Sequence, residues 1–306
     1  MYELIQVAPR TYYIDCPAKI GLYRINDSEI CLIDSGSDAD AAKKILKHLT
    51  ANAWTLRAVY ITHSHADHTG GCATLANRTG CSIYAPEGDL SFTRHPQHEP
   101  SLLYGGCPPK PLRNKFLMAK PSSAKPLTPE ALPEGLEMIF LDGHCPAMAA
   151  FRTSDGVWFL GDCMSSAEII EKYHVNYLYD PRKYLDALET VKGLEGACFI
   201  PAHAPILEDV VSLADKNIAK VHEIAALILS LCETPAGFDA ILKGVFDHFD
   251  LNMNWGQYVL VGSTIRGYLA WLLDEGQLTT SFDSNRMLWK SALQSSQAEP
   301  EKNSAL

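Results

Sequence analysis

The most constraining feature of the sequence is the segment Thr62–Gly71, which reads Thr-His-Ser-His-Ala-Asp-His-Thr-Gly-Gly. It follows the apolar run 58–62, predicted to be a strand, and precedes a segment with helical spacing. Three histidines and one aspartate therefore stand within six residues at the C-terminal end of a strand. Because burying so many polar side chains without partners is unfavourable, the segment predicts a metal site.

The spacing within this segment divides the ligands into two pairs. Successive side chains of an extended strand point to opposite sides, so His63 and His65 share one side and can bind one ion. Asp67 and His68 lie at the turn into the helix and can face a second ion. The two glycines that follow allow a close approach of the backbone.

The chain around this segment alternates strands and helices, which predicts an α/β protein. Strands are expected at 11–16, 21–25 and 29–34, followed by a helix at 39–49 with an N-cap at Ser37–Asp38. A further helix is expected at 69–79, and one near Asp180–Pro181. Later strands are expected at 81–85, 136–141, 149–153, 157–161 and 198–202. Many short strands with few helices indicate two sheets faced by helices.

Residues 86–135 interrupt this pattern, because they contain ten of the 18 prolines. A long, weakly periodic segment of this kind is either a functional lid or a disordered insertion. Its stretch 110–125 holds five Lys or Arg and no acidic residue. If the segment folds over the metal ions, Lys115 and Lys120 are candidates to bind an anionic group of the substrate.

The third part, residues 206–293, predicts a mostly helical region. One apolar stripe runs from Leu207 to Cys232, two further helices are expected at 237–249 and 258–276, and the alternating segment 277–290 predicts a hairpin. This arrangement resembles a winged helix. With eleven acidic residues against six Lys or Arg, however, we expect a cap or dimerisation element and no binding of nucleic acid. The polar tail 294–306 is expected to be frayed.

Charge and cysteine content indicate which partners and which cellular compartment to expect. The 306 residues carry a formal charge of −10, which repels polyphosphates and anionic membrane surfaces. The nine cysteines are odd in number and form no Cys-x-x-Cys pair, and the first ten residues have no apolar core of a signal peptide. These features predict a reduced, cytoplasmic protein. The longest apolar run has nine residues, whereas a membrane span needs about 20, so no membrane segment is expected.

The segment His63–His68 matches position for position the H-x-H-x-D-H motif of the metallo-β-lactamase superfamily, which the sequence therefore resembles. Further ligand motifs follow in order at His144, in Gly161–Asp162 and at His203. After His144 this chain has Ala147–Met148 where relatives carry Gly-His. The resemblance covers roughly the first 205 residues.

The resemblance implies a fold and a ligand set. The fold is a four-layer αββα sandwich over 1–205 that contains the 86–135 insert, followed by the helical region 206–293. One ion would be bound by His63, His65 and His144, the other by Asp67, His68 and His203, and Asp162 would bridge them. His and carboxylate ligands favour two zinc ions, with iron or manganese as alternatives.

Two cations a few ångströms apart lower the pKa of a bridging water and polarise the bond under attack, which indicates hydrolysis. Asp67 and Asp162 are the candidate catalytic residues, and Asp67 can also orient the hydroxide. His65 stands where flavodiiron proteins carry Glu, which argues against that branch. Asp162 stands where zinc β-lactamases carry Cys, which argues against antibiotic hydrolysis.

With these two branches set aside, the chain resembles the glyoxalase II branch of the superfamily. A small ester-like substrate is therefore expected, a thioester first and a lactone second. The alternatives are a persulfide dioxygenase with a single iron and a metal-dependent nuclease or phosphodiesterase. The expected partner is a small molecule that carries an anionic group, and a homodimer is an open alternative. Tyr173, His174 and Tyr177 follow Asp162, and are either substrate contacts or a surface cluster. Cys145 and Cys163 are expected to be buried packing residues.

Overall fold

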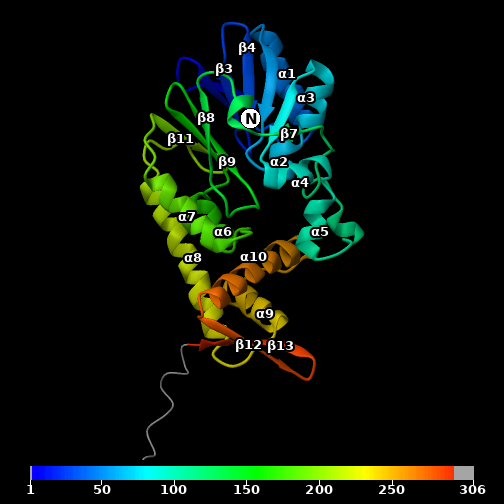
Figure 1. The fold of residues 1–306 in the computed structure, drawn as a ribbon, viewed down its shortest axis with the longest axis vertical. Coiled ribbons are helices and arrows are strands. Elements are labelled where there is room, and N and C mark those ends of the chain that lie inside the picture. Colours follow the sequence, from blue (N-terminus) through cyan, green and yellow to red (C-terminus); the bar gives the residue numbers. More distant parts are fainter. Residues whose placement is uncertain (1, 293–306) are drawn as a thin grey trace, which may run out of the picture.

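The structure is a computed structural model that describes residues 2–292. Two main sheets face each other, helices cover their outer sides, and a separate helical region extends below them (Figure 1). The predicted tail 294–306 lies outside the described residues.

The first sheet has seven strands in the order β1 to β7. Strand pairs are antiparallel from β1 to β4 and parallel from β4 to β7. The predicted N-terminal strands are confirmed as β2 to β4, whereas the sequence pattern does not predict the short edge strand β1. The strands are β1 (Glu3–Gln6), β2 (Thr11–Asp15), β3 (Ile20–Arg24), β4 (Glu29–Ile33), β5 (Thr55–Tyr60), β6 (Ser82–Ala85) and β7 (Lys125–Pro126).

The second sheet has four strands in the order β11-β10-β9-β8, with β10 and β11 parallel and the other pairs antiparallel. All four were expected from their apolar, β-branched and aromatic residues, and their bounds differ from the expected ones by one residue at most. They are β8 (Leu136–Phe140), β9 (Ala149–Thr153), β10 (Val157–Gly161) and β11 (Cys198–Pro201).

Three apolar cores separate four layers. Helices α1 (Ala39–Ala51) and α3 (Cys72–Thr79) bury Ile45 and Leu75 against the first sheet. Between the sheets, the rings of Tyr60 and Phe151 have centroids 6.1 Å apart. Helices α7 (Pro181–Lys192) and α8 (Val211–Leu231) cover the second sheet, where Leu188 is buried. This order confirms the expected αββα sandwich.

Helix starts follow the predicted caps, with one difference. The Asp38 carboxylate accepts hydrogen bonds from the backbone N–H groups of Asp40 and Ala41 at the start of α1. The helix expected at 69–79 is instead two helices, α2 (Ala66–Thr69) and α3. They are separated at Gly70, where a Cβ atom would lie 2.1 Å from the carbonyl carbon of Ser37, so only glycine fits this approach.

The proline-rich segment 86–135 has elements of its own. It contains α4 (Leu90–Arg94), α5 (His98–Tyr104), β7 and three 3-10 turns at Glu87–Asp89, Lys110–Leu112 and Pro129–Ala131. Prolines occupy the first turns of two of the 3-10 elements and the edge strand β7, positions that need no backbone N–H donor. This placement explains the missing periodicity and favours the ordered alternative.

The C-terminal region consists of α8, α9 (Phe238–His248), α10 (Trp255–Asp274) and a hairpin of β12 (Leu278–Asp283) and β13 (Arg286–Ser291). The expected helices and hairpin are thus confirmed, while α6 (Ala167–Tyr173) was not expected. Within residues 2–292, no helix combines the length and apolar character needed to cross a membrane.

Helix α10 extends from this region to α5 of the insert, as Figure 1 shows. Leu103 and Leu112 of the insert and Val259 of α10 form one small buried cluster. Tyr177, from the segment between α6 and α7, packs against the same cluster. The insert is therefore joined to the C-terminal region by apolar contacts.

Candidate metal centre

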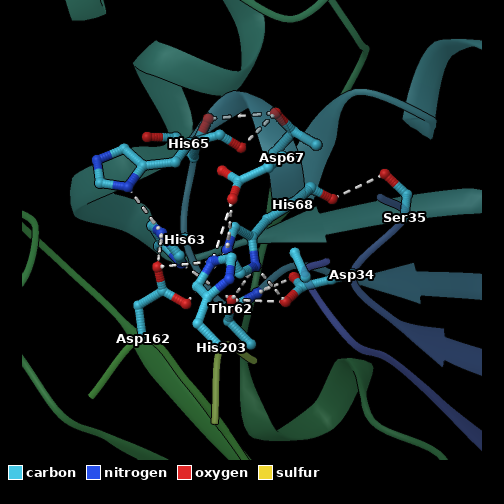
Figure 2. Close-up of polar contacts among 12 residues, drawn as sticks. Asp34, Ser35, Thr62, His63, His65, Asp67, His68, Asp162 and His203 are labelled. Carbon is cyan, nitrogen blue, oxygen red and sulfur yellow. Dashed lines mark hydrogen bonds and ion pairs between the residues drawn. The ribbon is translucent and has the colours of Figure 1, made fainter. Parts of the chain in front are cut away.

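The seven side chains expected to bind metal gather where strands of both sheets end. His63, His65, Asp67 and His68 follow β5, His144 follows β8, and Asp162 and His203 follow β10 and β11. The close-up in Figure 2 shows Asp162 and His203 facing the His63–His68 segment. The ligand atoms form two groups, His63, His65, His144 with Asp162, and Asp67, His68 with His203. Within each group all ligand atoms lie within 4.8 Å of one another.

In the first group three imidazole nitrogens converge. His65 Nδ1 lies 2.9 Å from His63 Nε2 and 3.0 Å from His144 Nε2. Burial is the main cause of a lowered pKa for all three rings, to about 4 for His65 and about 3 for His144. The rings are therefore neutral near pH 7, with lone pairs available to a cation.

In the second group, the Asp67 carboxylate lies near both His203 and His68. His203 Nε2 lies 3.1 Å from Asp67 Oδ2, and His68 Nε2 lies 3.7 Å from the same oxygen. The negative charge of Asp162 raises the pKa of His203 to about 10. Burial opposes protonation of His68, but Asp162, Asp67 and Asp34 outweigh it and raise the pKa of the ring.

Asp162 lies between the two groups. Its Oδ2 atom is 3.5 Å from His144 Nε2 in the first group and 3.4 Å from His203 Nε2 in the second. Burial would raise the pKa of this carboxyl, but His203 and His68 hold it well below its usual value. A buried, ionised carboxylate between two sets of ligands has the position of a bridging ligand.

The donor set fits divalent ions. In the part of the chain that the structure describes, His68 Nε2 and the Oδ1 atom of Asp162 are buried, meet no hydrogen-bond criterion and face each other at 3.3 Å. Buried polar atoms are otherwise almost always hydrogen-bonded, and a cation bound by both atoms would satisfy them. Imidazole nitrogens and carboxylate oxygens are the ligands that zinc, iron and manganese share.

Asp34, which the sequence analysis did not single out, holds this cluster in place. Its Oδ2 atom is 2.7 Å from His68 Nδ1, and its two oxygens accept hydrogen bonds from the backbone N–H and the hydroxyl of Thr62 (Figure 2). The contact fixes the proton of His68 on Nδ1 and leaves Nε2 free to bind metal. Asp34 itself has φ of 65°, a backbone conformation unfavourable for a non-glycine residue.

His203 is oriented in the same way by a backbone group. Its Nδ1 lies 2.8 Å from the carbonyl oxygen of Pro17, which accepts a hydrogen bond from the ring N–H. This contact directs Nε2 toward Asp67 and Asp162. The loop before His144 also depends on backbone contact. Gly143 has φ of +121°, and a Cβ there would lie 2.2 Å from the backbone nitrogen of Tyr184.

Two further carboxylates reach the centre from the insert. Asp89 is fully buried and accepts hydrogen bonds from the N–H groups of Ser64 and Ala147, so it ties together the loops that carry His65 and His144. Glu99 of α5 places Oε1 3.5 Å from His65 Nε2. Burial, then the charge of Asp89, raises the pKa of Glu99 to about 8.

The expected substrate contacts are distributed unevenly. Tyr177 lies at the centre, with ring centroids 5.4 Å from His65 and 5.7 Å from His144. His174 stacks on Phe249 at 4.7 Å, and Tyr173 is exposed. Lys115 is exposed and pairs with Asp38 at 3.7 Å.

Lys120 is also exposed, and neither this residue nor Lys115 lines the cavity next to the ligands. The roles in substrate binding expected for these two lysines, and for Tyr173, His174 and Tyr177, stay predictions. Cys145 and Cys163 are buried packing residues, as expected.

Comparison with known protein families shows which family the chain belongs to. The family model of the metallo-beta-lactamase superfamily matches residues 13–203, which include all seven ligands. The chain belongs to the metallo-beta-lactamase superfamily. Within the superfamily, a stretch of 49 residues is 49% identical to hydroxyacylglutathione hydrolase of Bradyrhizobium sp. (strain ORS 278), covering 16% of this chain and 19% of that protein.

A second stretch, of 68 residues, is 43% identical to hydroxyacylglutathione hydrolase of Rhodopseudomonas palustris (strain BisB18). It covers 21% of this chain and 25% of that protein. The chain thus matches about a fifth to a quarter of the length of these two superfamily members.

Solved structures are similar in fold to this chain over nearly its whole length. A metallo-beta-lactamase family protein from Thermus thermophilus has a TM-score of 0.69 and 18% identity, covering 94% of this chain and 97% of that one. A beta-lactamase domain protein from Burkholderia ambifaria has a TM-score of 0.72 and 16% identity, covering 95% and 94%. Because these matches extend beyond residues 13–203, the likeness in fold to these two proteins includes the helical C-terminal region.

Proposed function

We propose that this member of the superfamily is a hydrolase that binds two divalent metal ions, zinc first, and cleaves a small ester-like bond. The observation that carries the proposal is the position of Asp162, within 3.5 Å of a ligand nitrogen in each of the two groups. Iron and manganese are the alternative metals.

The residues have separate tasks in this proposal. His63, His65 and His144 would hold one ion, Asp67, His68 and His203 the other, and Asp162 both. Bound divalent ions would supply a hydroxide nucleophile at neutral pH and polarise the carbonyl of the substrate. Asp67, whose Oδ2 atom faces both His203 and His68, is placed to orient that nucleophile through its carboxylate.

A thioester is the first candidate substrate and a lactone the second. The stretches similar to hydroxyacylglutathione hydrolases support the thioester. If the thiol part of the substrate is anionic, the run of basic side chains that includes Lys115 and Lys120 is the candidate to attract it. The chain is proposed to act on a small molecule and not on nucleic acid, since the C-terminal region is acidic.

We also propose a reducing, cytoplasmic setting. All nine cysteines are free, and burial is the main cause that raises the pKa of Cys31 and Cys72 to about 12. Such thiols are poor nucleophiles and serve for packing.

The function is tested with zinc-reconstituted protein on a glutathione thioester, a lactone and an activated phosphodiester. Thioester turnover in the wild type, lost in Asp162→Ala, is the expected result. The matched control is Asp186→Ala on α7, an exposed acidic residue that should keep turnover and metal content unchanged.

Three results would contradict the proposal. Turnover of the phosphodiester alone would indicate a phosphodiesterase. Oxygen consumption with a persulfide and one iron per chain would indicate a dioxygenase. Full thioester turnover in Asp162→Ala would remove the bridging role of this residue.

A further inference from the structure

A cavity of about 170 Å³ opens directly onto the metal centre. His144, Asp162 and His203 form one side of it. The rest of the wall comes from the segment after β10, from α6, from the segment leading into α7 and from α7 itself. Its residues are Met164, Ser165, Ile169, Asn176, Tyr177, Leu178 and Tyr184. A group held in this cavity would lie next to the bond that is cleaved.

Away from the ligands, the wall is uncharged and partly apolar. Met164 and Leu178 are buried, and Ile169 adds a third aliphatic side chain. No described residue that lines the cavity is Lys or Arg, and Asp162 is the acidic one among them. A carboxylate buried here would therefore lose its hydration without gaining a cationic partner from the protein wall.

Three polar residues of the wall are hydrogen-bonded to Asn217 of α8, which is 3% exposed, or to one another. Asn217 Oδ1 accepts hydrogen bonds from the Tyr184 hydroxyl and from the Ser165 backbone N–H, both at 3.0 Å. Its amide group donates to the carbonyl oxygen of Ser165, and Asn176 donates to the Ser165 hydroxyl at 2.9 Å. Ser165, Asn176 and Tyr184 are thus engaged in hydrogen bonds within the protein.

The lysine of the adjoining cavity is already engaged. Lys220 lines a smaller cavity of about 20 Å³ that shares Asn176, Leu178 and Tyr184 with the first one. Its ammonium group pairs with Glu223 at 2.6 Å and lies over the Phe249 ring. It is therefore not free to neutralise a substrate carboxylate.

We propose that this cavity binds the acyl part of the substrate. The substrate is then an ester or thioester whose acyl chain is short, aliphatic and uncharged. The proposal rests on the hydrolase function proposed above and adds its specificity. An apolar cavity of about 150 Å³ accommodates a molecule the size of benzene, so this one suits an acyl chain of about four to six carbons. The basic run of the insert remains available for the thiol part.

The experiment compares acetyl, propionyl, butyryl, octanoyl and succinyl thioesters of one small neutral thiol on the zinc-loaded full chain. Each added methylene up to butyryl should raise kcat/KM about fourfold, and octanoyl should exceed the cavity and lose this gain. The succinyl thioester should be cleaved at least about tenfold less efficiently than the butyryl thioester, because its carboxylate finds no cation in the wall.

Ile169→Trp fills the cavity and should abolish the preference for butyryl over acetyl. The matched control is Val211→Trp, an exposed position at the start of α8 outside the cavity lining, which should keep the preference. Equal kcat/KM for all acyl chains in the wild type, or for succinyl and butyryl, would overturn the proposal while leaving the hydrolase function intact.

A binding measurement separates the two proposals if no thioester is cleaved. Non-hydrolysable ketone analogues of the acetyl, propionyl and butyryl thioesters are titrated into the same protein by calorimetry. Affinity that rises with chain length, and falls in Ile169→Trp, would retain the acyl cavity although the hydrolase function had failed. Affinity that is independent of chain length would overturn the cavity proposal as well.

Discussion

Two sets of side chains border the metal centre, and they differ in chemistry. The insert contributes the buried carboxylates Asp89 and Glu99, which contact the loops and rings that carry ligands. The cavity wall contributes aliphatic side chains and neutral polar groups that are paired with one another. We infer from this difference that the acidic insert side orients the ligands and the neutral side receives the substrate. Variants on one side should therefore leave the other property unchanged.

The largest effect is expected where both sides meet, at Asp162. Asp162→Asn keeps the shape of the side chain but removes the charge shared by the two ligand groups. We expect fewer than two metal ions per chain and a fall in kcat of about 10³-fold or more. Metal analysis and steady-state kinetics check this, and a variant with two ions and normal kcat would contradict the shared role.

The next effect is expected at Asp34, which orients His68. Asp34→Ala removes the acceptor of the His68 Nδ1 proton and leaves Thr62 with unpaired donors. Loss of such a partner typically lowers metal affinity by roughly 10- to 100-fold. Competition with a chromogenic chelator measures the affinity. Unchanged affinity would show that Asp34 is not needed to orient His68 for metal binding.

Glu99 tests the acidic insert side by itself. Glu99→Ala should weaken metal binding about tenfold, because His65 loses the carboxyl group next to its Nε2 atom. Glu99→Gln should recover part of this affinity, since the amide oxygen can take the place of the carboxyl oxygen 3.5 Å from this ring nitrogen. The ratio of butyryl to acetyl turnover should not change in either variant. A changed ratio would show that the two sides are not separate.

Asn217 tests the neutral side. Asn217→Ala leaves the Tyr184 hydroxyl and the Ser165 N–H without their acceptor, which should destabilise the fold by about 1–3 kcal/mol. The acyl preference should weaken because the wall loosens, while metal affinity stays the same. Urea unfolding, chelator competition and the acyl series measure the three properties on one preparation.

The smallest effect is expected at the exposed lysines of the insert. The double variant Lys115→Ala, Lys120→Ala should raise KM for an anionic thioester by up to about fivefold, since exposed charge pairs contribute little. KM for a neutral thioester serves as the control and should be constant. An equal KM for the anionic substrate before and after the change would remove these lysines from substrate binding.

The ligands were predictable because they are local to strand ends. His63, His65, Asp67 and His68 lie within six residues, and each remaining ligand directly follows or nearly follows an apolar strand. The residues that orient them were not predictable in the same way. Asp89 and Glu99 lie in the proline-rich insert, where no periodicity indicates which side chains turn inward.

Other misses have the same long-range origin. Asn217 contacts Ser165 across 52 positions of the chain, and Asp34 contacts His68 across 34. An acidic residue directly after the apolar strand β4 was the one available signal for Asp34. The break between α2 and α3 depends on the approach of Ser37 to Gly70, a contact that no local helical pattern reveals.

The cluster that joins Leu103, Leu112 and Val259 has a consequence for how such proteins diverge. Because Tyr177 packs on the same cluster, substitutions in the insert and in α10 should shift its ring beside His65 and His144. The insert and the C-terminal region therefore form one packing unit, although the 70 residues of 136–205 separate them in the chain. A chimera that exchanges both segments together should retain the arrangement of Tyr177, whereas one that exchanges either segment alone should lose it.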